Sequence, residues 1–383
     1  MENILVSLAG EISLKSTPVR RAFERKLRRN IKRAVKVRTF RNLGAKFALE
    51  VDDVDDSLRA LGRIFGVAWA SRVTVLDSSD LDEVLVFVKR NYSDWIPEGS
   101  TFAVRVRRVG EHPYKSIDVA RKVGELVDRK IDLKNPDVEL FIEIRGNRTY
   151  FYTDWDRIKG PDGLPLGTAG TVVCLISGGL DSPVASWMMM KRGCSVVALY
   201  AMSPLAPEGL RRFFDVFKVL REWHVGERMR AFVYRADYDL TSFGKEALRH
   251  AYVLERRIMV RVASELARRV GAKGIVTGDS LGQVSSQTLD NLYVIDRAAS
   301  FPIYRPLISF DKNEIAELAR RIGTYEISTR KCYQECGSLT ACVRKPVTKA
   351  KMEKVLKIEN KIGSDRMLEN CLSTLEEVTA LIR

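Results

Sequence analysis

The segment SGGLDS, from Ser177 to Ser182, has the clearest capacity for chemistry in the sequence. It follows a short apolar run, VVCLI, and precedes a helical pattern with Pro183 in its first turn. Adjacent glycines let a backbone turn sharply close to an anion, and the free N–H groups at the start of a helix favour a phosphate. A tight strand-to-helix turn without a ligand is the alternative, and the six residues alone do not separate the two interpretations. The segment is neither a Walker A loop nor the GxGxxG of dinucleotide-binding folds.

The pattern around this segment predicts the elements that position it. From about Thr171 onward, short apolar runs rich in β-branched residues alternate with amphipathic stretches. This alternation predicts an α/β domain with a parallel sheet and helices on both faces. Ligands bind such sheets at the carboxyl ends of the strands, and SGGLDS follows the first strand of the domain. Its position therefore favours phosphate binding.

The N-terminal half has a different pattern. Residues 1–72 combine strands such as NILVSLA with an amphipathic helix at about 19–37, which predicts a small α+β unit. Residues 73–168 contain a further strand, TFAVRVRR, and end in a loop rich in glycine and proline. We therefore expect three domains, at 1–72, 73–168 and 169–383.

The charge of the chain indicates a polyanionic partner. The formal net charge is +15, and nine basic residues share the helix at 19–37 with one acid, Glu24. This excess favours nucleic acid over a thermophile-like surface, in which the two signs are nearly balanced. The sequence has no run of 18 apolar residues, and its first residues lack the pattern of a signal peptide. We therefore expect a cytoplasmic protein without a membrane span.

The SGGLDS segment matches the SGGxDS pattern of the PP-loop ATP pyrophosphatases, and the similarity extends along the chain. The segments GIVTGDSLGQVSSQTLDNL (274–292) and RPLISFDKNEIAELARRIGTYEIS (305–328) resemble the ThiI family, the tRNA 4-thiouridine synthetases or tRNA sulfurtransferases. LAGEISLKS and TFAVRVRR resemble the opening segment and the THUMP domain of that family. The resemblance implies an α/β fold, in which a parallel-sheet PP-loop domain follows a ferredoxin-like α+β domain and a THUMP RNA-binding domain. It also implies a short form without a rhodanese domain.

The resemblance places ATP and Mg²⁺ at the SGGLDS loop. Asp181 and Lys312 match residues that the family needs for activity, and Asp181 is also the expected metal ligand. A metal held by a carboxylate would carry the charge of the leaving pyrophosphate. Without the resemblance, Lys312 is interpreted as a solvated lysine at a helix start. The residues that match nucleotide-binding positions of the family are Leu175, Ile176, Ser177, Gly178, Gly179, Ser182, Tyr200, Ala201, Arg256, Gly278 and Gln287.

The reaction that the resemblance implies has two halves. The O4 atom of a tRNA uridine, at position eight in this family, attacks the α-phosphate of ATP, and sulfur then displaces AMP at C4. Cys336 matches the cysteine through which sulfur is delivered. Archaeal members without a rhodanese domain typically carry a CxxC pair tied to an iron–sulfur cluster, and this sequence has Tyr252 and Glu255 at those two positions.

Cys332 and Cys342, which lie close to Cys336 in the sequence, could take over the role of the missing CxxC pair. Six cysteines in 383 residues are too few for a disulfide framework. In our first-ranked interpretation, Cys332 or Cys342 resolves a persulfide on Cys336 as a disulfide. In the alternatives, the three cysteines hold an iron–sulfur cluster, or Cys336 acts alone. The other three cysteines fit core or helix positions.

The prediction of tRNA binding depends on the charge pattern and on the resemblance to a THUMP domain. Basic residues give affinity for the phosphate backbone but little sequence reading. The tRNA-binding candidates are Arg105, Arg107, Lys115, Arg121 and Lys122. The family also implies a homodimer and a sulfur donor, either sulfide or a persulfide-carrying protein. Two other functions compete with this one: a PP-loop enzyme that makes a 2-thio product in tRNA, and a non-catalytic tRNA-binding protein.

Overall fold

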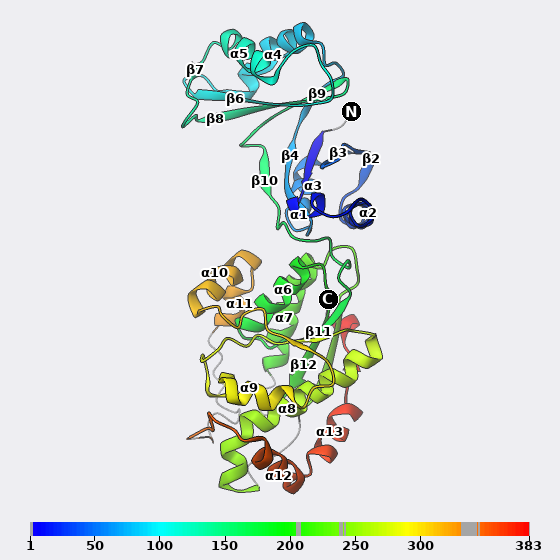
Figure 1. Cartoon of the computed structure of the whole chain (residues 1–383), viewed down its shortest axis with the longest axis vertical. Helices are drawn as coiled ribbons and strands as arrows, with labels where there is room; N and C mark the ends of the chain where they lie inside the picture. The colour runs from blue at the N-terminus through cyan, green and yellow to red at the C-terminus, as the bar shows by residue number, and fades with distance from the viewer. Residues whose placement is uncertain are drawn as a thin grey trace. The chain divides into compact units, whose positions relative to one another are not determined.

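The computed structural model describes residues 3–203, 208–236, 240, 243–330, 343 and 345–382. The chain folds into two compact units, Met1–Leu164 and Pro165–Arg383 (Figure 1). The boundary between them falls in the loop rich in glycine and proline. Among the described residues, no helix is both long enough and apolar enough to span a bilayer.

A five-stranded antiparallel sheet forms the first part of the N-terminal unit. Its order is β10-β4-β1-β3-β2, with β1 at Ile4–Leu8, β2 at Val37–Asn42, β3 at Lys46–Val51, β4 at Val67–Arg72 and β10 at Arg157–Lys159. The helices that accompany it are α1 (Gly10–Ser13), α2 (Thr17–Ala34) and α3 (Val54–Leu61). Strand β10 pairs with β4, so residues 157–159 join this sheet although the sequence analysis groups them with residues 73–168.

Helix α2 lies slightly earlier in the chain than its apolar spacing predicts. Pro18 stands in its first turn, where a missing N–H costs nothing, and the extended backbone of Val35 ends the helix. Leu27 and Ile31 are buried along its inner stripe. The basic residues occupy the remaining surface of the helix, as the sequence pattern predicts.

A second five-stranded sheet completes the N-terminal unit. Its order is β5-β9-β8-β6-β7, with β5 at Thr74–Leu76, β6 at Thr101–Val109, β7 at Lys130–Ile131, β8 at Val138–Arg145 and β9 at Arg148–Thr153. Helices α4 (Leu81–Trp95) and α5 (Ser116–Leu126) cover one face of this sheet (Figure 1). Val84 and Val119 of these helices pack against Phe102 and Leu140 of the strands, so the sheet has a core of its own.

The C-terminal unit contains the predicted parallel sheet. Its order is β15-β14-β11-β12-β13-β16, with β11 at Thr171–Leu175, β12 at Ser195–Met202, β13 at Arg230–Arg235, β14 at Ile275–Val276, β15 at Ile303–Tyr304 and β16 at Glu376–Glu377. All pairs are parallel except β13 with β16. The chain builds outward from β11 in one direction through β12 and β13, and later in the other direction through β14 and β15. The strand order therefore reverses beside β11, where such sheets bind ligands.

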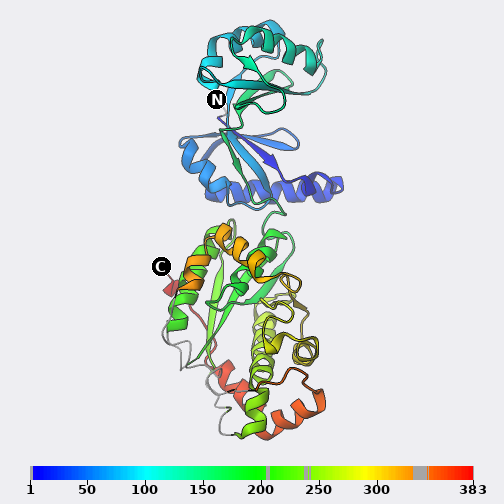
Figure 2. The ribbon, with the colours of Figure 1, turned by 90° about the vertical axis from the view of Figure 1, so that its left-hand side faces the viewer.

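Two groups of helices cover the two faces of this sheet (Figure 2). One group comprises α6 (Asp181–Lys191), α7 (Glu208–Trp223), α10 (Lys312–Ile322) and α11 (Tyr325–Thr329). The other comprises α8 (Lys245–Val270), α9 (Leu289–Asp296), α12 (Met352–Ile362) and α13 (Ser364–Ser373), together with the short 3₁₀ segment η2 (Ser285–Gln287). Another 3₁₀ segment, η5 (Thr379–Leu381), follows β16.

A buried ion pair connects the helices of the second group. The Nε and Nη2 atoms of Arg257, on α8, each donate to Glu359, on α12, over 2.8 Å. Both side chains are less than a tenth exposed. The pair therefore secures α8, the helix that supplies one wall of the site described next.

Candidate functional site

A cavity of about 680 Å³ opens at the carboxyl ends of β11, β12 and β14. The SGGLDS loop forms one wall, and η2 and α8 form others. Most residues that the family resemblance assigns to the nucleotide line it: Leu175, Ile176, Ser177, Gly179, Asp181, Ser182, Tyr200, Ala201, Arg256, Gly278 and Gln287. Segments that are distant in the sequence thus meet at the switch point of the sheet.

The SGGLDS loop is closed by its own serines. The backbone N–H of Ser177 donates to the Ser182 Oγ over 2.8 Å, and the two hydroxyl oxygens are 3.1 Å apart. The N–H of Gly179 donates to the Ser177 Oγ over 3.2 Å. The hydroxyl groups of Ser177 and Ser182, two residues that the resemblance assigns to the nucleotide, therefore also shape the turn. Helix α6 starts at Asp181, so its first N–H groups face the loop.

Glycine is required at two contacts of the loop. A Cβ at Gly178 would lie 2.4 Å from the Arg212 Cδ, because the stem of Arg212 covers the loop there. A Cβ at Gly278 would lie 2.7 Å from the Ser182 nitrogen and 2.9 Å from the Asp181 carbonyl carbon. The end of β14 therefore packs directly against the start of α6, and Gly278 allows this approach.

The carboxylate of Asp181 is partly desolvated in the cavity wall. Burial raises its pKa, and the negative charge of Asp279 adds to that increase, while the Gln283 hydrogen bond and the charge of Lys312 oppose it. The Gln283 Nε2 lies 3.4 Å from the Asp181 Oδ2. Lys312 is the first residue of α10, whose N-cap is Asp311. A carboxylate in this environment would gain from a bound cation.

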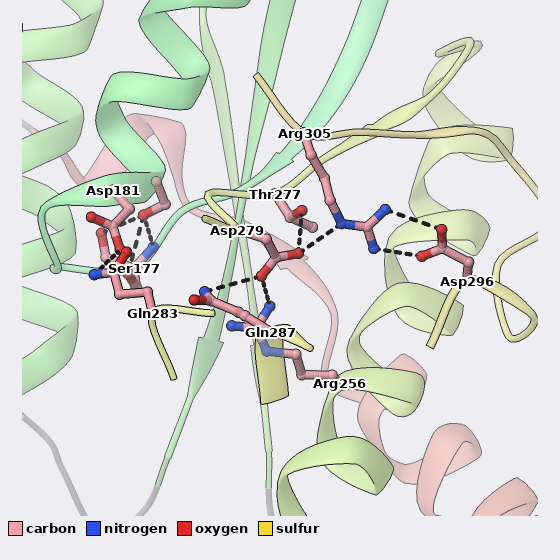
Figure 3. A network of polar contacts seen from close by, with 10 residues as sticks. Ser177, Asp181, Arg256, Thr277, Asp279, Gln283, Gln287, Asp296 and Arg305 are labelled. Atoms are coloured by element: carbon pink, nitrogen blue, oxygen red, sulfur yellow. Dashed lines mark hydrogen bonds and ion pairs between the residues drawn. The ribbon is translucent and has the colours of Figure 1, made fainter. Parts of the chain in front are cut away.

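A second carboxylate, Asp279, also lines the cavity but is only 1% exposed, and Figure 3 shows its polar contacts. Its partners are Arg256, Thr277, Gln287 and Arg305. Burial tends to raise the pKa of Asp279, but the Arg256 charge, the Thr277 hydrogen bond and Arg305 outweigh it and lower the pKa below its usual value. The sequence analysis missed Asp279 and Arg305. The signal available for Asp279 was an acidic residue directly after a buried strand, in KGIVTGD.

The opposite end of the cavity is apolar and aromatic. Tyr200 is largely buried and stacks on Phe213, with ring centroids 4.9 Å apart. Burial raises the pKa of Tyr200 to about 12, so its hydroxyl stays neutral at ordinary pH. Tyr252 and Glu255, which stand where archaeal relatives typically have cysteines, also line the cavity from α8.

The three cysteines proposed for sulfur transfer, Cys332, Cys336 and Cys342, lie outside the described residues. The chain leaves the described part at Arg330, close to the SGGLDS loop. The Ser328 Oγ donates to the Gly179 carbonyl over 3.2 Å, and Arg212 donates to the Arg330 carbonyl over 3.1 Å. The remaining cysteines, Cys174, Cys194 and Cys371, are buried, as expected for core residues. Within the described ranges, no three His, Cys, Asp or Glu side chains form a metal-binding group.

A second cavity, of about 300 Å³, lies between the two sheets of the N-terminal unit. The amino group of buried Lys46, on β3, contacts the carboxylate of Glu143, on β8, and its Nζ lies 4.2 Å from the centre of the Trp69 ring. Burial, together with the charges of three arginines, lowers the pKa of Lys46 to about 6. Arg105 and Arg107 line the mouth of this cavity.

The five tRNA-binding candidates therefore fall into two sets. Arg105 and Arg107 belong to β6 and share the second cavity, although the Arg105 Nε also pairs with Glu139 over 2.8 Å. Lys115 is the N-cap of α5, and Arg121 and Lys122 lie on that helix. On α2, Arg20 and Glu24 form an i,i+4 pair of 2.7 Å, an exception to the otherwise unbalanced charge of that helix.

Known families and proteins match nearly the whole chain, including both the N-terminal unit and the C-terminal unit that contains the cavity. The chain matches the family model described as thiamine biosynthesis protein (ThiI) over residues 167–363, the THUMP domain over 79–154 and the ThiI ferredoxin-like domain over 3–71. A Saccharolobus islandicus protein named probable tRNA sulfurtransferase is 42% identical over 376 residues, which cover 96% of this chain and 98% of that protein. A Methanosarcina acetivorans protein of the same name is 38% identical, with 98% of this chain and 93% of that protein covered.

Solved structures agree with the sequence comparisons. A 4-thiouridine synthetase in complex with RNA and bound ATP has a TM-score of 0.86 and 30% identity, and the match covers 98% of this chain and 99% of that one. A Pyrococcus horikoshii protein has a TM-score of 0.66 and 25% identity over 84% of this chain and 99% of that one. The predicted fold, a PP-loop domain preceded by ferredoxin-like and THUMP domains, is confirmed. The chain belongs to the ThiI family.

Proposed function

We propose that this protein is a tRNA sulfurtransferase that uses ATP to convert a tRNA uridine, at position eight, to 4-thiouridine. One observation carries the proposal: the SGGLDS loop, Asp181, Arg256 and Gln287 converge on a single cavity at the switch point of a parallel sheet. The similarity to a 4-thiouridine synthetase that binds RNA and ATP supports the same assignment.

The cavity suits ATP at both ends. The N–H groups at the start of α6 favour phosphates, and the apolar wall around Leu175 and Tyr200 suits a base. The Oε1 of Gln287 is buried without a hydrogen-bond partner among the described residues. A buried acceptor of this kind is costly unless a ligand supplies a donor, and the base and ribose of ATP offer several.

Asp181 fits a single ligand position for Mg²⁺, because it is the partly desolvated carboxylate beside the phosphate loop. Phosphate oxygens of ATP would complete the coordination, since Mg²⁺ is usually held by one or two carboxylates together with substrate phosphates. When bound, the ion neutralises charge on the leaving pyrophosphate. Lys312, whose charge already acts on Asp181, provides further positive charge there.

The proposed reaction activates the uridine before sulfur arrives. The O4 atom attacks the α-phosphate of ATP, pyrophosphate leaves, and O4 carries AMP. A sulfur nucleophile then attacks C4, and the C4–O4 bond breaks with AMP as the leaving group. Activation is needed because a carbonyl-type oxygen is a poor leaving group, whereas AMP is a good one.

Sulfur reaches C4 through Cys336 in this proposal. The close contacts of Ser328 and Arg330 with the loop and with Arg212 support it, because they attach the start of the cysteine-bearing segment beside the ATP site. A persulfide-carrying donor first passes its outer sulfur to the Cys336 thiolate, and this outer sulfur attacks C4. The Cys332 or Cys342 thiolate then attacks the Cys336 sulfur, the S–S bond to the transferred sulfur breaks, and the disulfide that forms is reduced by an external thiol. In the alternative, all three cysteines hold an iron–sulfur cluster, and sulfide is the donor. Anaerobic purification with iron and sulfide analysis separates the two: a colourless, iron-free and fully active enzyme contradicts the cluster.

The N-terminal unit binds the tRNA in this proposal. Arg105, Arg107, Lys115, Arg121 and Lys122 contact its phosphates, and the protein acts as a homodimer. The sulfur donor is a persulfide-carrying protein if Cys336 carries a persulfide, and sulfide if the cysteines hold a cluster. The basic surface of the unit supports this assignment.

The test is incubation with ATP, Mg²⁺, unmodified tRNA and a sulfur source, either sulfide or a persulfide with a thiol reductant, followed by digestion and identification of the nucleosides. We expect 4-thiouridine. A 2-thiouridine product would indicate a different thiolating enzyme of the PP-loop class. Absence of both pyrophosphate release and thiolated nucleoside would indicate a non-catalytic tRNA-binding protein.

A further inference from the structure

Asp279 is the most buried charged side chain of the cavity region, and the reaction proposed above gives it no role. It is almost completely shielded from solvent, yet it follows β14 in the cavity wall, next to Gly278, which packs against the SGGLDS loop. We propose that Asp279 is a positioning residue, which holds the Arg256 guanidinium and the Gln287 amide in the orientation that receives the nucleotide. This inference rests on the proposed function, because it takes the cavity to be the ATP site.

The hydrogen bonds of Asp279 show that it acts through its neighbours (Figure 3). Its Oδ1 accepts from the Arg256 Nη1 and from the Gln287 Nε2, the latter over 3.4 Å. Its Oδ2 accepts from the Thr277 Oγ1 over 2.7 Å and from the Arg305 Nε over 3.0 Å. A carboxylate has about four acceptor positions, so these four donors occupy it fully. The protein thus leaves Asp279 no acceptor position for a ligand or a metal.

The four partners of Asp279 lie on two sides of it. Arg305 lies away from the cavity, at the back, whereas Arg256, Gln287 and Thr277 line the cavity, at the front. At the back, Arg305 is itself nearly buried and also binds Asp296, with its Nη1 3.0 Å from the Asp296 Oδ2. This second pair fixes Arg305, which in turn keeps Asp279 ionised and in place. At the front, Arg256 and Gln287 line the cavity. The front residues therefore depend on Asp279, whereas Arg305 has an additional anchor.

The Asp279 carboxylate determines which end of the Gln287 amide faces it. An ionised carboxylate only accepts hydrogen bonds, so it binds the nitrogen end of the amide. The oxygen end, Oε1, is then left buried without a partner among the described residues, as an acceptor for a donor on the nucleotide. A neutral amide at position 279 would remove this constraint and allow Gln287 to turn over.

Arg256 depends on Asp279 in a similar way. Its side chain is 31% exposed, so without its partner the guanidinium is able to turn into water. The ion pair orders it before the nucleotide arrives, and a pre-ordered group loses less conformational freedom on binding. Loss of Asp279 is therefore expected to weaken ATP binding even though its acceptor positions are already occupied by protein donors.

A double-mutant cycle on the full chain tests the proposal. Asp279→Asn, Arg256→Met and the double variant are compared with the natural sequence by calorimetric titration with ATP and Mg²⁺. We expect each single change to weaken ATP binding about tenfold, and the double variant to bind no more weakly than Arg256→Met alone within about threefold. The coupling would then approach tenfold, or about 1.4 kcal/mol. ATP affinity of Asp279→Asn within twofold of the natural protein, or losses that multiply in the double variant, would overturn the proposal.

Two further variants separate positioning from general damage. Ser280→Ala is the matched control, because Ser280 is the next residue, is buried and donates to the Phe310 carbonyl over 2.8 Å outside the network. It should lower the midpoint of thermal unfolding but keep ATP affinity within twofold; an affinity loss as large as that of Asp279→Asn contradicts a specific role. Thr277→Val removes one hydrogen bond from the carboxylate without a change of charge or shape. If Asp279→Asn does not fold, Thr277→Val carries the test: several-fold weaker ATP binding supports the proposal, and unchanged binding refutes it.

The results that would refute the proposed function differ from those that would refute the role of Asp279. A natural protein that neither binds ATP nor releases pyrophosphate with tRNA refutes the ATP site itself. A fully active natural protein together with an unaffected Asp279→Asn variant refutes only the role of Asp279.

Discussion

The substitution Gly278→Ala tests the close approach between β14 and the start of α6. The added methyl carbon would lie 2.7 Å from the Ser182 nitrogen and 2.9 Å from two further backbone atoms of Asp181 and Ser182. Ordinary carbon contacts to such atoms begin at roughly 3.5 Å. Because all three neighbours are backbone, no side-chain rotation relieves the overlap. The loop and the strand must therefore separate by an amount on the order of 0.5–1 Å.

A displacement of this size should act mainly on catalysis. Misplacement of reacting groups by about 1 Å costs roughly a hundredfold in rate, so we expect a loss of ten- to a hundredfold in kcat/KM for pyrophosphate release with tRNA. ATP binding should weaken as well, because the N–H groups of the loop and α6 move together. Overpacking is also expected to lower the stability of the C-terminal unit by about 1–3 kcal/mol.

Gly274→Ala is the matched control for this prediction. Gly274 directly precedes β14, and its added methyl group would lie 2.3 Å from the Tyr304 Cε2 and 3.2 Å from the Pro302 carbonyl oxygen, its nearest backbone atom. Tyr304 is 42% exposed and is able to swing outward. We expect a similar or smaller loss of stability with ATP affinity and kcat/KM within about twofold. If Gly278→Ala retains full activity, or if Gly274→Ala loses as much activity, the contact between β14 and α6 does not position the loop.

Three further predictions concern the rest of the molecule. The pKa of Lys46 is lowered to about 6, so the folded state binds fewer protons than the unfolded state above that pH, and stability should rise as pH increases from 6 to 8.5; Lys46→Met should flatten this rise in thermal unfolding curves, and parallel curves would contradict it. Glu359→Gln leaves buried Arg257 without its charged partner and should lower the free energy of unfolding by about 3 kcal/mol in denaturant titrations, whereas a loss below about 1 kcal/mol would argue against a strong pair. Arg107→Ala should weaken tRNA binding and reduce the slope of log K against log salt concentration by about one, while Arg59→Ala on α3 should leave that slope unchanged; equal slopes for both would remove Arg107 from the RNA surface.

The strands and helices of the C-terminal unit could be predicted because each is encoded by a short, contiguous stretch of sequence. The strand, the turn and the helix around SGGLDS are contiguous, so glycine, proline and apolar periodicity suffice to place them. The members of the cavity that lie elsewhere, such as Arg256 and Gln287, were identified only through the family resemblance. Spacing alone does not bring them beside the loop.

Tertiary pairing explains what the sequence analysis missed. Asp279 binds Arg256 and Arg305 from positions 23 and 26 residues away, and Lys46 meets Glu143 across 97 residues. No local pattern encodes such partners. Strand β10 is a similar case, because its three residues return to a sheet that the chain left at β4. Arg105, a tRNA-binding candidate from the sequence, pairs with Glu139 of the neighbouring strand β8, which no local pattern indicates.

The central claim is that ATP activates the uridine by adenylation of O4, and isotope transfer tests it most directly. A tRNA with ¹⁸O at O4 of the target uridine is incubated with the enzyme, ATP, Mg²⁺ and a sulfur source, either sulfide or a persulfide with a thiol reductant, and the AMP is analysed by mass spectrometry. Because O4 bonds to the α-phosphorus and then leaves C4, the account predicts one ¹⁸O atom in AMP for each 4-thiouridine formed. Formation of 4-thiouridine with unlabelled AMP, or with ADP as the nucleotide product, would contradict it.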